Sequence, residues 1–241
     1  MLHEILERLS EVVVGYQRWH EILFLHWSVP PEAVRPMVDA RLGIDLFDGR
    51  AFVSLTPFTV RGARLRGAPA VPFVSDFHEL NFRTYVRAGG GAAGVWFFSL
   101  DAASAVASAL ARAGLGLPYR VARMERSVAG STHEFRSERV ALRAQPVSFA
   151  ARWTVGPLRA DRVPGSLEHF LVERYALYST HAGRLLRVRV RHRPWVLRDA
   201  TVERLEETLT SGVRLAAAAE PPLVQFSSGV DVEFFPPEVV R

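Results

Sequence analysis

One segment of the chain carries polar side chains at every second position. In residues 77–87, acidic, amide, phenolic and basic side chains alternate with mostly apolar ones. Successive side chains of a β-strand point to opposite faces, so this spacing predicts a strand with one polar face. A carboxylate and a guanidinium on one face suit the binding of an anionic or carbonyl-bearing molecule. The polar face consists of Glu79, Asn81, Arg83, Tyr85 and Arg87.

The sequence is compatible with two environments for this polar face. On an open sheet, the polar side chains would face water. In a closed barrel they would line the interior, where Glu79 and Arg83 could form a partly buried ion pair. Trp96 and Phe98 from the next predicted strand would then line the same cavity. Such a cavity would suit a ligand that carries a carboxylate or a carbonyl group.

Composition excludes several kinds of chemistry. The 241 residues contain no Cys and no Lys, so all 30 basic residues are Arg. Disulfides, thiolate metal sites and cysteine nucleophiles are therefore excluded, and so are lysine Schiff bases and phosphate-binding loops that need a lysine. The chain has no G-x-S-x-G motif, and its eight His are scattered without metal-binding spacing. We expect neither a metal nor a cofactor.

Two further patterns have structural interpretations. Residues 89–94 match G-x-G-x-x-G, but the apolar run after them predicts a strand, whereas dinucleotide binding requires a helix there. In residues 187–193, four Arg alternate with Val and His, which places four guanidinium groups on one strand face. Such a row could follow a phosphate backbone, but no aromatic residues interleave for base stacking, and the net charge is only +5. We therefore favour a solvated strand face and expect no nucleic-acid partner.

Most of the chain has the pattern of strands and turns. A hairpin turn at Asp48-Gly49 is predicted to join the first two strands after residue 40, and Asp101 is predicted to begin a helix. Further short helices are predicted from residue 31 and over residues 166–174, and residues 195–208 fit either a strand or a helix. The fold class is α+β, built on one large curved or closed sheet. Strands are predicted at residues 21–27, 42–47, 51–60, 80–87, 95–100, 119–126, 133–143, 148–155, 175–180, 184–193 and 221–235.

The chain is expected to form a single domain of residues 1–241. The pattern of residues 2–13 predicts an amphipathic helix that is appended to the domain. This helix would pack on the body of the domain or on a partner chain, and in the second case the protein would form a homo-oligomer. No apolar run reaches the roughly 18 residues that span a bilayer, and residues 1–4 lack the pattern of a signal peptide. We expect a cytoplasmic protein without a membrane partner.

Four runs of sequence resemble the YqjF-like family, a bacterial family of unknown function in the acetoacetate decarboxylase-like superfamily. The runs are WHEILFLHW at 19–27, DLFDGR at 45–50, GVWFFSLD at 94–101 and LPYR at 117–120. The likeness extends over about residues 17–240. It implies a curved antiparallel sheet that closes into a barrel or cone around a central pocket.

A more distant resemblance to acetoacetate decarboxylases implies roles for individual residues. Those enzymes carry a Glu in an aromatic-x-Glu context, which Phe77-His78-Glu79 matches. After a helix they carry Pro-Lys-Lys, whose first Lys forms the Schiff base, whereas this chain has Pro118-Tyr119-Arg120. Neither a phenol nor a guanidinium forms an imine, so covalent decarboxylation is not expected.

The resemblance thus implies an altered site. Glu79 would transfer a proton if burial raises its pKa, and Tyr119 would donate a hydrogen bond to a carbonyl or enolate oxygen, unless it is only a packed barrel tyrosine. The leading hypothesis is a barrel that binds a small, anionic molecule. The alternatives are a lysine-independent enzyme of the lyase, isomerase or hydratase kind that acts on an oxo acid or enol, and a protein-interaction module. The candidate ligand-binding residues are His26, Asn81, Arg83, Tyr85, Trp96, Phe98 and Arg120.

Overall fold

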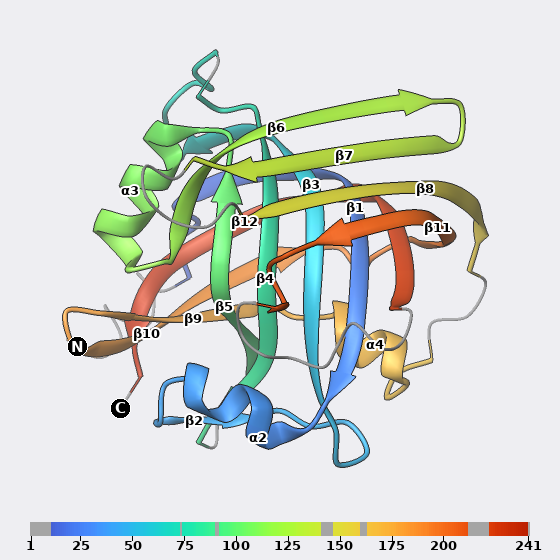
Figure 1. Cartoon of the computed structure of the whole chain (residues 1–241). Helices are drawn as coiled ribbons and strands as arrows, with labels where there is room; N and C mark the ends of the chain where they lie inside the picture. Colours follow the sequence, from blue (N-terminus) through green and yellow to red (C-terminus); the bar gives the residue numbers. More distant parts are fainter. Residues whose placement is uncertain are drawn as a thin grey trace.

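The computed structural model describes residues 11–72, 74–89, 92–140, 147–159, 163–211 and 222–240. Its described strands belong to one sheet (Figure 1). The predicted N-terminal helix, residues 2–13, falls mostly outside the described residues. The elements are β1 (Gly15–Val29), α2 (Pro31–Val34), a 3-10 turn (Arg35–Met37), β2 (Leu42–Ile44), β3 (Ala51–Leu65), β4 (Phe77–Ala88), β5 (Ala93–Ala102), α3 (Ala105–Leu115), β6 (Tyr119–Ala129), β7 (Thr132–Arg139), β8 (Ser148–Leu158), α4 (Leu167–Val172), β9 (Ala176–His181), β10 (Arg184–His192), β11 (Leu197–Glu207) and β12 (Leu223–Val239).

The sheet closes on itself in two places. β5 pairs with β4, β6 and β9, and β12 pairs with β1, β10 and β11. Three routes therefore join these two strands: through β4, β3 and β1; through β9 and β10; and through β6, β7, β8 and β11. The first and second routes enclose a seven-stranded ring, and the first and third enclose a nine-stranded ring. The two rings share the wall formed by β12, β1, β3, β4 and β5.

The predicted α+β class with a large closed sheet is confirmed, but two strand pairs are parallel. β5 runs parallel to both β6 and β9. Parallel neighbours need a crossover connection, and α3 supplies it between β5 and β6. Among the described residues, no helix is both long and apolar enough to cross a membrane.

Side chains on the two faces of the shared wall belong to different hydrophobic cores. On β1, Ile22 and Phe24 pack in the core of the seven-stranded ring, whereas Leu23 and Leu25 pack in a second core. The second core also contains Phe135 of β7 and Trp153 of β8, so it lies between the wall and the third route. A strand buried on both faces needs a continuous apolar run, which explains the sequence of residues 22–25.

The predicted hairpin between residues 42–47 and 51–60 is wrong. Asp48 and Gly49 do form a turn, with φ of 48° and 75°, and a bridge between Phe47 and Arg50 closes it. However, β2 pairs with residues 86–88 of β4, beyond the part of β4 that pairs with β3. β3 instead pairs with β1 and β4, because its apolar side chains are buried on both faces.

The start of α3 also differs from the prediction. Ser104, and not Asp101, caps the helix, by accepting a hydrogen bond from the backbone N–H of Ala107. Asp101 lies in β5, where it forms a buried ion pair with Arg139 of β7. The undecided segment 195–208 contains β11, and β3 continues to residue 65, beyond the predicted strand at residues 51–60.

Candidate functional site

A cavity of about 420 Å³ lies inside the seven-stranded ring. All seven strands of the ring contribute to its wall, as do α3 and Tyr119, the first residue of β6. Leu65 at the end of β3 and Leu110 on α3 line the cavity and are 70% and 68% exposed, so they mark its mouth. Val172 and Trp195 are buried and line the cavity as well, in the core of the same ring.

Glu79 and Tyr119 form a hydrogen-bonded pair in this cavity. Glu79 is 5% exposed on β4, and the Tyr119 hydroxyl on β6 donates a hydrogen bond of 3.1 Å to its Oε2. Burial raises the pKa of Glu79 to about 7, against hydrogen bonds from Tyr119 and Asn81 that lower it. Burial and the adjacent carboxyl also raise the pKa of Tyr119 well above its ordinary value. Near neutral pH, this pair therefore holds an exchangeable proton on Glu79 and a neutral phenol on Tyr119.

Arg83 also lines the cavity, and among the described residues no carboxylate pairs with it. Arg83 is only 8% exposed, and its Nε and Nη2 atoms have no hydrogen-bond partner within the described part of the chain. Its guanidinium carbon lies 5.8 Å from the ring centre of Phe24 and 5.9 Å from that of Tyr85. A buried guanidinium without a counter-charge is a costly arrangement that a bound anion would relieve.

The predicted ion pair between Glu79 and Arg83 does not form. The two residues share a face of β4, but they are four positions apart, which is about 13 Å along the strand. Glu79 interacts with Tyr119, while Arg83 lies further along β4 from the mouth, opposite Ser54 of β3. Glu79 and Arg83 are thus separate polar positions of the wall, and Asn81 lines the cavity between them.

Arg174 is a second arginine of the cavity wall, but its charge is compensated. Its Nη1 lies 2.5 Å from Oδ2 of the buried Asp45, and its guanidinium carbon lies 4.1 Å from the ring centre of Phe170. Arg83 and Arg174 therefore differ in one respect that matters for binding. Of the two, Arg83 has its charge available for a ligand, whereas the charge of Arg174 is paired with Asp45.

Tyr85 and His26, two predicted ligand-binding residues, bond to the protein itself. The Tyr85 hydroxyl donates to the backbone carbonyl of Leu171 and contacts Ser54 Oγ, which in turn lies 2.6 Å from His26 Nδ1. Neither residue lines the cavity. They form a buried layer next to Arg83. Burial lowers the pKa of His26 to about 3, and the positive charge of Arg83 contributes to this decrease.

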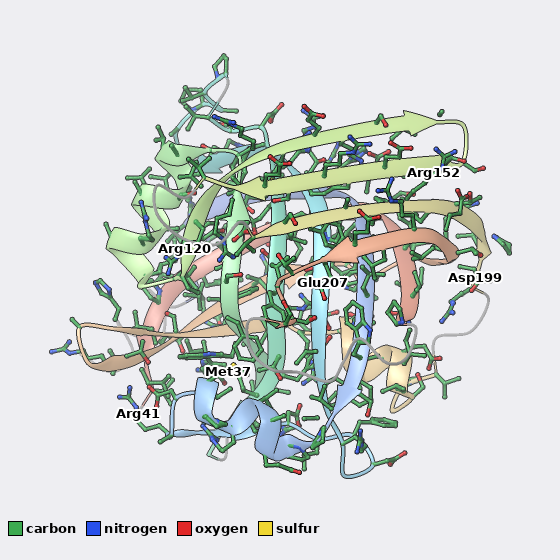
Figure 2. The ribbon with its side chains drawn as sticks, in the orientation of Figure 1. Met37, Arg41, Arg120, Arg152, Asp199 and Glu207 are labelled. Carbon is green, nitrogen blue, oxygen red and sulfur yellow. The ribbon has the colours of Figure 1, made fainter. Side chains whose placement is uncertain are left out.

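The predicted places of Trp96, Phe98 and Arg120 in the site are wrong. Val95 and Phe97 line the cavity, because the neighbours of a lining residue on a strand point to the opposite face. Trp96 donates its ring N–H to the carbonyl of Met37, and Phe98 packs on Phe82. Arg120 follows Tyr119 on β6, so it faces outward and is exposed (Figure 2).

Sequence reasoning missed most of the apolar wall. The inward side of the arginine-rich strand β10 contributes Val188, Val190 and His192 to the cavity. Its outward arginines form ion pairs with Glu238 and Glu233 of β12, in agreement with the predicted solvated face. The alternation in residues 187–193 therefore already contained the signal for these lining residues. Trp19, Phe58 and Trp195 complete the aromatic part of the wall.

The ring of strands around this cavity is the fold of acetoacetate decarboxylase-like proteins. An acetoacetate decarboxylase-like enzyme from Sphingomonas wittichii RW1 is similar with a TM-score of 0.64, over 95% of this chain and 94% of that chain. The enduracididine biosynthesis enzyme MppR complexed with pyruvate is similar with a TM-score of 0.63, over 95% of this chain and 91% of that chain. Both are 12% identical to this chain, so the likeness establishes the fold.

The chain belongs to the DUF2071 family, described as an uncharacterized conserved protein, which matches residues 16–231. The chain is also 34% identical over 220 residues to the uncharacterized protein YqjF of Bacillus subtilis (strain 168). That alignment covers 91% of this chain and 90% of YqjF. The resemblance to the YqjF-like family is thereby confirmed, and the solved structures show that the chain has the acetoacetate decarboxylase-like fold.

Proposed function

We propose that this protein binds a small molecule with a carboxylate or carbonyl group in the cavity of the seven-stranded ring, without Schiff-base chemistry. The observation that carries this proposal is Arg83, a buried guanidinium in the cavity wall with no carboxylate partner among the described residues. A guanidinium presents its N–H groups in a fork that matches the two oxygens of a carboxylate. The structural neighbour MppR, described in complex with pyruvate, supports a carboxylate as the ligand class.

Substituting Arg83 tests this proposal because it should lower the affinity for the ligand and raise the stability of the free protein. We expect Arg83→Met to weaken the binding of 2-oxo acids and small aromatic carboxylates about tenfold to a hundredfold, since a hydrogen-bonded charge is lost. The same substitution is expected to raise the free energy of unfolding of the free protein, because it removes an uncompensated buried charge. Calorimetric titration and urea denaturation measure the two effects.

Arg87→Met is the matched control, because Arg87 lies on the same strand but is exposed and outside the cavity wall. We expect it to leave ligand affinity unchanged. If the unmodified protein binds none of these acids, or if Arg83→Met binds them equally well, the proposed function is wrong.

The Glu79–Tyr119 pair favours a second candidate function, a lysine-independent enzyme that acts on an oxo acid or an enol. With a pKa of about 7, Glu79 can take a proton from the carbon next to a carbonyl and return it. The electron pair left on that carbon would move to the carbonyl oxygen, and Tyr119 would donate a hydrogen bond to the resulting enolate oxygen. This route requires no imine, so it is open to a chain that has no lysine.

Deuterium exchange tests the enzymatic candidate without a known product. In D₂O, the α-protons of a bound 2-oxo acid should exchange for deuterons, and NMR follows their loss. We expect Glu79→Gln to slow the exchange about a hundredfold, with a smaller effect for Tyr119→Phe. The rate in the unmodified protein should rise with pH through about 7, as Glu79 becomes the base. Equal rates in all three proteins would remove these residues from the mechanism.

A further inference from the structure

We infer that the ligand is an amphipathic acid, with its carboxylate on Arg83 and an alkyl or arylalkyl tail directed toward the mouth of the cavity. This inference rests on the proposed function and specifies its ligand class. It differs from a three- or four-carbon oxo acid in that most of its binding surface would be apolar. The argument combines the size of the cavity, the nature of its wall and the place of Arg83 in it.

The cavity is too large for a very small acid. A protein cavity of about 150 Å³ holds a benzene molecule, so by proportion 420 Å³ has room for about seventeen non-hydrogen atoms. A three- or four-carbon acid would fill less than half of this space. A carboxylate with a chain of about ten further atoms would fill most of it.

The wall between Arg83 and the mouth suits an apolar tail. Aromatic rings and aliphatic side chains from several strands form most of it, and the ring of Trp19 stacks over that of Trp195 with 6.1 Å between centres. Two polar atoms of this stretch, Asn81 Oδ1 and His192 Nε2, have no hydrogen-bond partner within the described part of the chain, whereas other polar groups bond to the protein. Tyr119 donates to Glu79, and the Trp19 ring N–H donates to Gln17. The apolar part of the wall is formed by Ile22, Phe58, Val95, Phe97, Leu100 and Val188.

The position of Arg83 fixes the direction in which the ligand would lie. On β3 and β4, the pairing runs from Val60 with Phe77 near the mouth, through Phe58 with Glu79, to Ser54 with Arg83. β3 continues in the opposite direction to Leu65, whose side chain is at the mouth. A carboxylate on Arg83 therefore leaves the tail to pass Glu79 and Tyr119 and to reach the exposed apolar side chains of Leu65 and Leu110.

A homologous series of carboxylates from acetate to dodecanoate, below their aggregation concentrations, tests this inference by calorimetric titration. We expect affinity to increase about three- to fourfold for each added methylene group, up to a chain of about ten carbons. The alcohol octanol should bind much more weakly than octanoate, because it lacks the group that Arg83 recognises. Arg83→Met should weaken every member of the series by a similar factor.

Two substitutions on α3 locate the tail. Ala107 lines the cavity, whereas Ala113 on the same helix is exposed and outside the wall. We expect Ala107→Phe to weaken octanoate binding at least tenfold and butyrate binding little, while the matched Ala113→Phe changes neither. Ala111→Phe, at a second lining position, replaces Ala107→Phe if that variant does not fold.

The outcomes separate this inference from the function on which it rests. If short and long acids bind with equal affinity and Arg83→Met weakens both, carboxylate binding stands and the apolar tail is refuted. If α3 variants weaken butyrate and octanoate equally, the assigned direction of the tail is refuted. If no acid of any length binds, the proposed function itself fails.

Discussion

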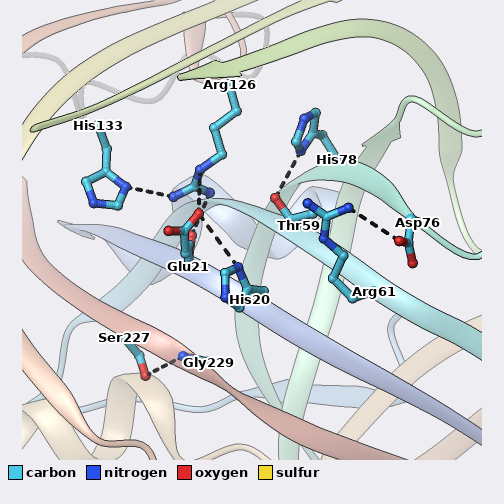
Figure 3. A network of polar contacts seen from close by, with 10 residues as sticks. All are labelled: His20, Glu21, Thr59, Arg61, Asp76, His78, Arg126, His133, Ser227 and Gly229. Carbon is cyan, nitrogen blue, oxygen red and sulfur yellow. Dashed lines mark hydrogen bonds and ion pairs between the residues drawn. The ribbon is translucent and has the colours of Figure 1, made fainter. Parts of the chain in front are cut away.

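Glu21→Gln is expected to lower the free energy of unfolding by about 3 kcal/mol, because it leaves a buried arginine without its counter-charge. Glu21 lies in β1 and its Oε2 is 3.0 Å from Nε of Arg126, which comes from β6 across the nine-stranded ring (Figure 3). The Arg126 side chain is only 5% exposed. It also donates hydrogen bonds to the Glu21 carbonyl and to His133.

The other charged group close to Arg126 increases the expected cost. Burial lowers the pKa of Arg126 to about 10, Glu21 opposes this effect, and the nearby Arg61 lowers the pKa further. Without the Glu21 charge, burial and Arg61 both act against the charged form of this guanidinium with no carboxylate to oppose them. Glu21 also has a φ of 51°, unusual for a residue other than Gly, which the contacts of Arg126 with both its carboxylate and its carbonyl help to hold.

Urea denaturation at pH 7.5 measures this effect. Asp231→Asn is the matched control, since it breaks the ion pair of Asp231 with Arg18, in which both side chains are largely exposed. Exposed pairs contribute little, so we expect the control to change the free energy of unfolding far less than Glu21→Gln does. A loss for Glu21→Gln no larger than that of the control would show that Arg126 needs no counter-charge in the folded protein.

The second large effect concerns the pH dependence of stability. The Glu79 carboxyl has a pKa of about 7 in the folded protein against an ordinary value of 4.5. The folded state therefore holds this proton more tightly than the unfolded state. The stability that comes from the protonated carboxyl is fully present below pH 4.5 and is lost as the pH rises through 7, which amounts to about 3 kcal/mol.

Glu79→Gln removes this titration and leaves a side chain of similar shape. We expect the stability of the variant, relative to the unmodified protein, to increase by about 3 kcal/mol between pH 4.5 and pH 8. His26 and the other buried groups titrate in both proteins, so their effects cancel in the difference. A difference that stays constant over this pH range would contradict the raised pKa of Glu79.

Tyr119→Phe provides an independent check of the same titration. The hydrogen bond from Tyr119 lowers the pKa of Glu79, against the larger effect of burial. Without this hydrogen bond, the pKa of Glu79 should rise further, and the loss of stability should shift to higher pH. Urea denaturation of the three proteins at several pH values gives the comparison.

The alternation in residues 77–87 was sufficient to predict β4 and its polar face, because strand geometry alone fixes which side chains share a face. It did not establish what that face meets. Whether Glu79 and Arg83 face water or a cavity depends on the closure of the sheet by pairings of β12 with β10 and of β5 with β9, between residues far apart in the sequence. The resemblance to a barrel superfamily supplied that part of the prediction.

The errors in the predicted site have local causes. Trp96 and Phe98 were placed on the wrong face because Val95–Phe98 is apolar throughout, so its alternation does not show which side faces the cavity. A register shift between β4 and β5 at Phe82 and Arg83 adds to this ambiguity. Arg120 was grouped with Tyr119 through a family motif, although adjacent residues of a strand cannot share a face. The predicted ion pair of Glu79 with Arg83 did not take into account that the two residues are about 13 Å apart along the strand.

The wall shared by the two rings restricts how substitutions can reshape the cavity. Residues of β1, β3 and β4 that face the cavity alternate with residues that pack in the second core, so a substitution on these strands that reshapes the cavity also disturbs that core. β10 has its arginines outside the ring, and α3 covers only the cavity side, so their inward residues vary without that constraint. Selectivity among relatives should therefore diverge first on β10 and α3, while the common wall stays nearly invariant.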